Sequence, residues 1–403
     1  MIAAVSAGVT YPNGFRASGI AAGMKPSGRR DLALLLGDPG TTAAGTFTSN
    51  AVVAAPIVLS QKHLASGGGR GVLVNSGQAN AATGSRGDAD AEAAVSAAAA
   101  ILGIPPNELL QCSTGVIGEP LHMDALLGGL PALAAAARVD GGADFARAIM
   151  TTDTVAKSAT TDAGPYRVGG AAKGVGMISP SLATMLAFVT TDAPVSAGDL
   201  QTAASTVLAP VFNAITVDGC TSTNDTVLVF ASGAASSGRI APGGAAWNAW
   251  ADAIETVGAS LASQLIHDGE GVTHVMLVDI AGAASEHDAR VVAKAVADSP
   301  LVKTAAFGGD PNPGRLLQAV GSSGVDVDPA AIDVAIGGVR LVHGGAIPAG
   351  YFEDDSLSSA ARVAMKELEI HIEVSLGQGP GRSRALGCDL SYEYVRINGE
   401  YTT

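Results

Sequence analysis

One stretch in the middle of the chain, Lys173 to Thr184, combines residue types that could carry out self-cleavage. It is rich in small residues, contains Pro180, and ends with Ala183 and Thr184 directly before an apolar run. If the Ala183 carbonyl is strained, the Thr184 hydroxyl can attack it, and an N-to-O acyl shift followed by hydrolysis would free an N-terminal threonine. Its α-amino group, which titrates near pH ~8, can then deprotonate its own hydroxyl. On spacing alone, a loop that leads into a core strand is the commoner interpretation.

A second polar stretch, Cys112 to Gly118, could supply an oxyanion hole. In a tight turn, Thr114 and Gly115 can direct one hydroxyl and one backbone N–H at a single point. Taken alone, the pattern is more typical of an ordinary strand-ending turn. Cys112 has no basic partner nearby in the sequence, so we expect a small buried core residue rather than a nucleophile.

Three further polar clusters each have an ordinary structural explanation, and two of them also have a functional one. Thr151 lies in a Thr-Thr-Asp sequence that could end a helix or contact a ligand. Glu270 follows a long predicted helix and could face a ligand cation, although a solvated carboxylate is the default and Gly269 suits a helix C-cap. The last residues, Asn398 to Thr403, would ordinarily fray.

Common cofactor and metal motifs are missing from the sequence. It contains no GxGxxG, GxxxxGK[ST], HExxH or GxSxG pattern. The three cysteines are far apart, which argues against a disulfide framework or a zinc ribbon and favours a reducing cytoplasm. We therefore expect no metal and no resident cofactor.

The composition excludes several classes of partner. A formal net charge of −14 argues against nucleic acid and anionic membranes, because both require a basic surface. No apolar stretch approaches the ~20 residues of a membrane span, and the beginning of the chain lacks the pattern of a signal peptide. We expect a soluble, cytoplasmic, globular protein.

Alternating strands and helices must position these residues, which indicates an α/β or α+β fold. The length of 403 residues favours two core units or one large sandwich. The apolar pattern predicts strands over residues 31–36, 44–48, 71–74, 182–189, 226–231 and 274–280 and near Val334 and Ile370. It predicts helices over residues 89–102, 123–138, 144–150, 199–213 and 289–297, and a long one carrying Trp247, Trp250, Ile254, Val257 and Leu261.

Taken together, these segments resemble the bifunctional glutamate N-acetyltransferase / ornithine acetyltransferase family of arginine biosynthesis. The matches follow one another in order along nearly the whole chain, which makes them far more specific than any single motif. They include residues 14–17, 75–80, 113–118, 148–153, 172–177, 182–186, 222–226, 268–271, 301–304 and 398–403.

The resemblance implies a protein that cuts itself into an α chain of residues 1–183 and a β chain of residues 184–403. Such chains usually assemble as an α2β2 heterotetramer. The implied fold is a layered α-β-β-α sandwich with a smaller C-terminal α/β subdomain. The sandwich is similar to that of N-terminal-nucleophile hydrolases, with different connectivity.

The resemblance also implies roles for individual residues. Thr184 would be the nucleophile, and Thr114 and Gly115 would stabilise the oxyanion. Substrate contacts would come from Thr151, Lys173, Thr184, Glu270, Asn398 and Thr403. The implied reaction is ping-pong transfer of acetyl from N-acetylornithine to glutamate, with acetyl-CoA left open as a co-substrate.

Two alternatives remain open at the level of sequence. A related N-terminal-nucleophile aminopeptidase or amidohydrolase would share the self-cleavage but release acyl groups to water. A non-catalytic binding protein of the same fold would need to have lost Thr184, Thr114 or Gly115, and all three are present. One departure from the family is Pro313, where tryptophan is usual, and it puts the shape of that loop in doubt.

Overall fold

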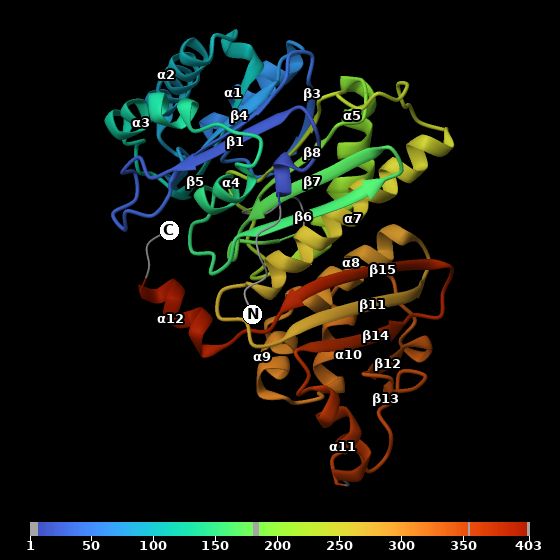
Figure 1. Ribbon diagram of the computed structural model, residues 1–403. Coiled ribbons are helices and arrows are strands. Elements are labelled where there is room, and N and C mark those ends of the chain that lie inside the picture. The colour runs from blue at the N-terminus through green and yellow to red at the C-terminus, as the bar shows by residue number, and fades with distance from the viewer. Residues whose placement is uncertain (1–6, 180–184, 354, 401–403) are drawn as a thin grey trace. The chain divides into compact units, whose positions relative to one another are not determined.

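The computed structural model describes residues 7–179, 185–353 and 355–400 (Figure 1). Contacts divide the described chain into two compact units. The first comprises residues 7–213 and 221–265, and the second comprises residues 214–220 and 266–400. Neither boundary falls at residues 183 and 184, so the compact units do not coincide with the two chains that the sequence predicts.

The first unit contains two β-sheets (Figure 1). The four-stranded sheet has the order β1 (Phe15–Ile20), β2 (Leu32–Gly37), β4 (Gly71–Gln78) and β5 (Leu109–Val116). The five-stranded sheet has the order β3 (Thr42–Phe47), β10 (Thr226–Ala231), β8 (Leu186–Thr191), β7 (Tyr166–Lys173) and β6 (Lys157–Ala163). β4 and β5 are parallel, as are β8 and β10.

These two sheets pack face to face and carry helices on their outer faces. The core between them includes Leu35 and Val74 from one sheet and Phe188 and Phe230 from the other. Apolar residues of α1 (Ala55–Ala65), α2 (Gly84–Leu102) and α3 (Met123–Ala135) join Leu73 on the outer side of the four-stranded sheet. α5 (Ala197–Ala203) and α7 (Ala245–His267) cover the five-stranded sheet. The predicted α-β-β-α layering is therefore confirmed.

Shorter helical segments complete the first unit. They are the 3-10 turns Gly8–Thr10 and Pro106–Glu108, α4 (Gly142–Ala148), a π-helical segment Ala204–Leu208 and α6 (Ala209–Phe212). The helix predicted over residues 199–213 is thus divided into three parts, because the backbone changes from α to π and back within it.

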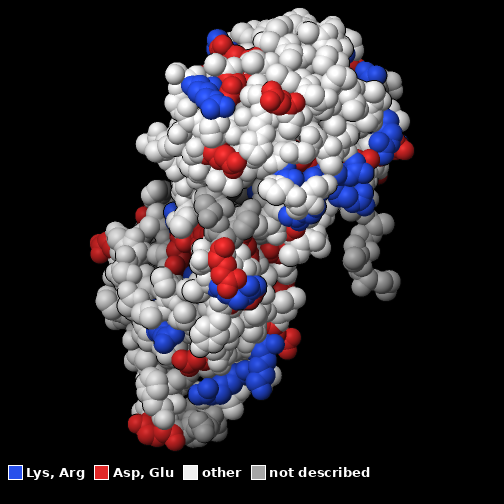
Figure 2. All heavy atoms as spheres, turned by 90° about the vertical axis from the view of Figure 1, so that its left-hand side faces the viewer, with Lys and Arg blue, Asp and Glu red and all other residues white. Residues whose placement is uncertain are grey.

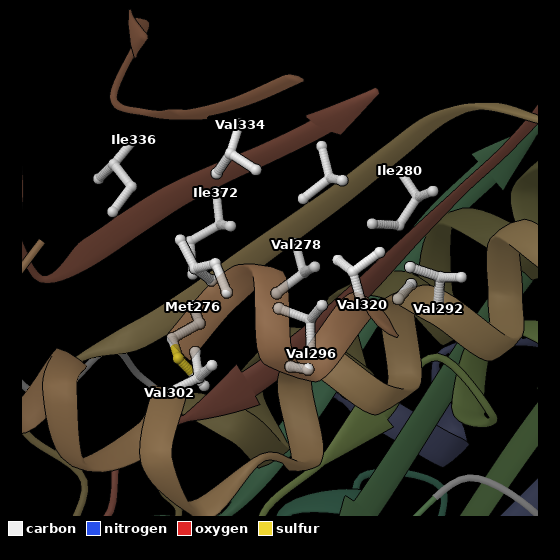
Figure 3. Close-up of a cluster of buried hydrophobic side chains, with 14 of the residues drawn as sticks. Met276, Val278, Ile280, Val292, Val296, Val302, Val320, Val334, Ile336 and Ile372 are labelled. Carbon is white, nitrogen blue, oxygen red and sulfur yellow. The ribbon is translucent and has the colours of Figure 1, made fainter. Parts of the chain in front are cut away.

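The second unit is built on one six-stranded sheet. Its order is β13 (Val339–Val342), β12 (Asp333–Ile336), β14 (Glu369–Ser375), β11 (Val275–Ala283), β15 (Gly381–Cys388) and β9 (Ile215–Thr216). Its helices are α8 (Glu286–Asp298), α9 (Pro300–Gly308), α10 (Pro313–Gly321), α11 (Asp355–Ala364) and α12 (Tyr392–Glu400). Met276, Val278 and Ile280 of β11 pack with Val292 and Val296 of α8 in its core (Figure 3). This unit is the smaller α/β subdomain that the sequence predicts.

The segment around Pro313, expected to be a loop, is the beginning of a helix. The Asn312 side chain accepts a hydrogen bond from the Arg315 N–H at 3.1 Å, as an N-cap residue does, and Pro313 opens α10. Proline suits this position because the first helical N–H has no partner within the helix. The departure from the family therefore leaves a regular local structure.

Two glycine-containing segments differ from what the sequence indicates: residues 166–173 are not predicted as a strand, and Gly269 is expected to cap a helix. Gly169 and Gly170 lie inside strand β7, where a Cβ on Gly169 would come 2.1 Å from the Gly8 carbonyl oxygen. Gly269 does not have the left-handed backbone of a C-cap glycine, which occurs at Gly271 with φ of 69°.

Charged side chains on the face drawn in Figure 2 occur in small groups of both signs, separated by uncharged surface. The excess negative charge is therefore not gathered into one patch on that face. Within residues 7–179, 185–353 and 355–400, no helix combines the length and the apolar character that crossing a bilayer requires.

Candidate active site

The parallel strands β4 and β5 end side by side and bring Thr114 and Gly115 beside Gly77. Their register pairs Ser76 with Thr114 and Gly77 with Gly115. Gly115 has φ of 130°, and a Cβ there would lie 2.1 Å from the Gly77 carbonyl oxygen. Only glycine fits this backbone. The Thr-Gly pair thus lies in the distorted last residues of a strand, not in a separate tight turn.

Lys173 contacts Thr114 although the two residues are far apart in sequence. Lys173 is the last residue of β7, and its Nζ donates a hydrogen bond to Thr114 Oγ1 at 3.2 Å. Both side chains are 2% exposed. Because Thr114 Oγ1 accepts from an ammonium group, its own proton can be donated elsewhere. Two predicted site residues are therefore brought together.

Buried Asp153 organises the backbone around Thr151 and the end of β7. Its carboxylate accepts hydrogen bonds from Lys157 Nζ at 2.7 Å, Gly174 N–H at 2.8 Å and Thr151 N–H at 2.9 Å. Burial alone would raise the pKa of Asp153, but Lys157, Lys173 and the Gly174 N–H together hold it well below its ordinary value. Asp153 is therefore a buried carboxylate that fixes the backbone at Thr151 and at Gly174, the residue after Lys173.

The carbonyl of Thr151 is held by a basic segment near the beginning of the chain. Arg29 donates to the Thr151 carbonyl at 3.0 Å, and Lys25 Nζ donates to the Met150 carbonyl at 2.6 Å. Burial, with a contribution from Arg29, lowers the pKa of Lys25 to about 8. The sequence analysis missed this segment because Lys25 and Arg29 are separated from Thr151 by more than a hundred residues.

Ala183 and Thr184 lie outside the described residues. The two residues that follow them, Met185 and Leu186, have defined contacts. The Met185 N–H donates to Asp225 Oδ1 at 3.1 Å, and strand β8 begins at Leu186. Leu186 pairs with Lys173 of β7. The chain therefore enters the five-stranded sheet beside Lys173 at Leu186, two residues after Thr184 in the sequence.

Glu270 and Asn398 are brought together within the second unit. Asn398 Nδ2 donates to Glu270 Oε2 at 2.9 Å and to the Tyr394 carbonyl at 3.1 Å. Asn398 lies on α12, so the chain is helical to Glu400 rather than frayed. Thr403 lies outside the described residues. Gly271 has no room for a side chain, since a Cβ there would lie 2.4 Å from the Tyr394 nitrogen.

The prediction that Cys112 is a small core residue is confirmed. Cys112 is 2% exposed, and burial raises the pKa of its thiol to about 12. A thiol with this pKa is almost entirely protonated at neutral pH and therefore a poor nucleophile. In the described part of the chain, no three His, Cys, Asp or Glu side chains are grouped so that they could hold a metal ion.

Residues 16–403 match the ArgJ family. The chain belongs to the ArgJ family. The arginine biosynthesis bifunctional protein ArgJ of Symbiobacterium thermophilum is 46% identical over 99% of both chains. That of Geobacter sulfurreducens is 44% identical over 97% of this chain and 99% of its own. ArgJ membership makes the chain an acyltransferase of arginine biosynthesis.

A solved structure agrees with this assignment. The crystal structure of the arginine biosynthesis bifunctional protein ArgJ from Bacillus halodurans is 42% identical to this chain, with a TM-score of 0.51. The match covers all of that crystallised chain but 54% of this one. Within this chain, Thr114, Gly115 and Lys173 lie together and place a hydroxyl, a backbone N–H and an ammonium group near one another.

Proposed function

We propose that this chain cuts itself between Ala183 and Thr184 and then transfers acetyl from N-acetylornithine to glutamate through Thr184. The observation that carries the proposal is the buried contact of Lys173 with Thr114, next to Gly115 and beside the beginning of β8. This contact brings Lys173, Thr114 and Gly115 together near β8, the strand that follows Thr184 in the sequence.

The chemistry proceeds in two half-reactions. The free amine of Thr184 takes the proton of its own hydroxyl, and Oγ attacks the acetyl carbonyl of N-acetylornithine. The Thr114 hydroxyl and the Gly115 N–H donate to the oxyanion, which collapses and expels ornithine as the nitrogen takes up a proton. The amino group of glutamate then attacks the acetyl ester, giving N-acetylglutamate and free Thr184. Acetyl-CoA could load the same ester.

In this proposal the charges of the side chains decide which part of the substrate each residue contacts. Lys173 suits a substrate carboxylate, and Glu270 suits the side-chain ammonium of ornithine. Asn398 donates to Glu270 and would hold that carboxylate in place. Thr151 and Thr403 are the remaining proposed contacts, and the Asp153 hydrogen bond fixes the backbone of Thr151.

The two proposed chains, 1–183 and 184–403, would remain in one fold and pair as an α2β2 assembly. Supporting this, β8 and β10 of the second chain lie between β3 and β7 of the first in one sheet.

Intact mass spectrometry of the purified protein, combined with an acetyl-transfer assay, tests the proposal. We expect two polypeptides with a break before Thr184 and transfer of acetyl from N-acetylornithine to glutamate. Thr184→Ala should give one uncut, inactive chain, because it removes the attacking hydroxyl.

Thr184→Ser is the matched control, since it keeps a hydroxyl and should still cleave. A wild-type protein that stays whole and still transfers acetyl would contradict the mechanism. Release of acetate without any dependence on glutamate would indicate a hydrolase instead.

A further inference from the structure

Two adjacent buried residues, Asn224 and Asp225, lie directly before strand β10 and have no part in the chemistry proposed above. Their exposed fractions are 5% and 0%. Polar side chains that are this deeply buried are costly unless they are bonded. Their partners therefore indicate what they do.

Asn224 holds the strand end that carries Thr114. Its Nδ2 donates to the Ser113 carbonyl at 2.8 Å and to the Ala79 carbonyl at 2.6 Å. The Ser113 carbonyl belongs to the same peptide group as the Thr114 N–H. The Thr223 hydroxyl donates to Asn224 Oδ1 at 2.6 Å, which fixes the orientation of the amide. The Asn224 amide thus holds two backbone carbonyls in place, one directly after β4 and one near the end of β5.

Asp225 holds the peptide group that follows the proposed nucleophile. Its Oδ1 accepts from the Met185 N–H at 3.1 Å, and the next residue, Thr226, donates its N–H to the Met185 carbonyl at 3.1 Å. The Met185 nitrogen is bonded covalently to the carbonyl carbon of Thr184. Asp225 and Thr226 therefore bind the N–H and the carbonyl of Met185, respectively.

Burial disfavours the charged form of the Asp225 carboxyl. Burial raises its pKa well above the ordinary value, and the Met185 N–H, Thr48, Ser222 and Lys173 oppose this only in part. A carboxyl group has nearly the shape of an asparagine amide. Asparagine at position 225 could therefore still accept from Met185.

We propose that Asn224 and Asp225 act as a clip that holds the oxyanion-binding strand end and the peptide after the nucleophile at a fixed separation. The inference rests on the proposed function of Thr184. Both members are positioning residues, because they contact the backbone on either side of the reacting groups. The clip is needed for self-cleavage and for acetyl transfer, since both reactions place an oxyanion at the same point relative to Thr184.

Exchanging the two side-chain types tests the clip. Asn224→Asp keeps the shape but replaces donors to two carbonyls with a carboxyl. Asp225→Ala removes the acceptor for Met185, whereas Asp225→Asn keeps one. We expect the first two variants to cleave slowly and, per cleaved molecule, to show kcat lowered roughly 10- to 100-fold with KM for N-acetylornithine little changed. Asp225→Asn should behave like the wild type.

Asp192 provides the matched control at the other end of β8. It is 1% exposed and accepts hydrogen bonds from the Arg167 and Asn13 backbone N–H groups at 2.8 and 3.3 Å. Asp192→Ala should lower thermal stability about as much as Asp225→Ala while keeping kcat. Mass spectrometry over time, kinetics and melting temperature are measured on all variants.

The outcomes separate the two proposals. An uncut, inactive wild type overturns the proposed function and the clip with it. An Asn224→Asp variant that cleaves and transfers at wild-type rates overturns the clip alone. So does an Asp225→Ala variant whose melting temperature falls but whose kcat is kept, as expected of Asp192→Ala. An Asp225→Asn variant as slow as Asp225→Ala shows that the carboxyl itself is needed and overturns the positioning role.

Discussion

Gly115 is a position where the backbone permits only one residue. Its positive φ and the 2.1 Å approach of a Cβ to the Gly77 oxygen act together. Any side chain would push β5 away from β4 at the point where Thr114 meets Lys173. The buried hydroxyl of Thr114 and the buried ammonium of Lys173 beside this glycine are the reason that we propose an anion-binding role for it.

Gly115→Ala should therefore lower kcat roughly 100-fold or more, because it displaces the N–H that we propose as an oxyanion donor. It should also destabilise the fold by about 2 kcal/mol through backbone strain. Steady-state kinetics and urea unfolding measure both effects. Gly118→Ala is the control, since Gly118 also has a positive φ but no atom within 4 Å of a Cβ. It should share the strain and keep kcat, and an equal loss of kcat would contradict the role of Gly115.

Asp153 gives the protein a pH-dependent stability. Its folded-state pKa is lowered, so the stabilisation is fully present above the unfolded-state value near ~3.9 and is lost as the pH falls below it. Asp153→Asn leaves buried Lys157 without this countercharge and should cost roughly 3 kcal/mol at pH 7.

Urea unfolding between pH 7 and pH 3 checks this expectation. The difference between the wild type and Asp153→Asn should shrink as the pH falls. Asp140→Asn is the control, because Asp140 is a surface carboxylate with 80% of its side chain exposed, and it should change little. A difference that stays constant with pH would show that Asp153 does not act through its charge.

At the scale of elements, long periodic segments were predictable and glycine-rich ones were not. The apolar spacing around Trp250 and Val257 predicts α7, and the run from Thr226 to Ala231 coincides with β10. β7 was missed because its glycines are required by neighbouring backbone and carry no side-chain pattern. A strand such as β7, whose glycines are required by close packing, does not show the alternation of apolar and polar side chains from which strands are predicted.

The beginning of α10 offers a test at this scale. Asn312→Ala removes the N-cap acceptor for the Arg315 N–H and should cost about 1 kcal/mol in the free energy of unfolding, with kcat unchanged. Chemical denaturation measures the loss, and Asn312→Asp should retain the cap. No difference between the alanine and aspartate variants would argue against the cap.

At the scale of the whole molecule, residue types were predictable and their partners were not. Thr114, Gly115 and Lys173 could be selected from motifs, but their contact depends on the two sheets facing each other. The same reason kept Asn224 from being linked to Ser113, over a hundred residues earlier. Pairings across this sequence distance follow from topology, which no local pattern encodes.

Strand β8 is paired on both sides, antiparallel to β7 and parallel to β10. A cut before Thr184 would leave β3, β6 and β7 on one polypeptide and β8 and β10 on another. The uncut precursor folds in a first-order process, whereas the processed protein, once unfolded, must recombine two molecules. Its recovery from denaturant would therefore rise with protein concentration, and folding would have to come before cutting.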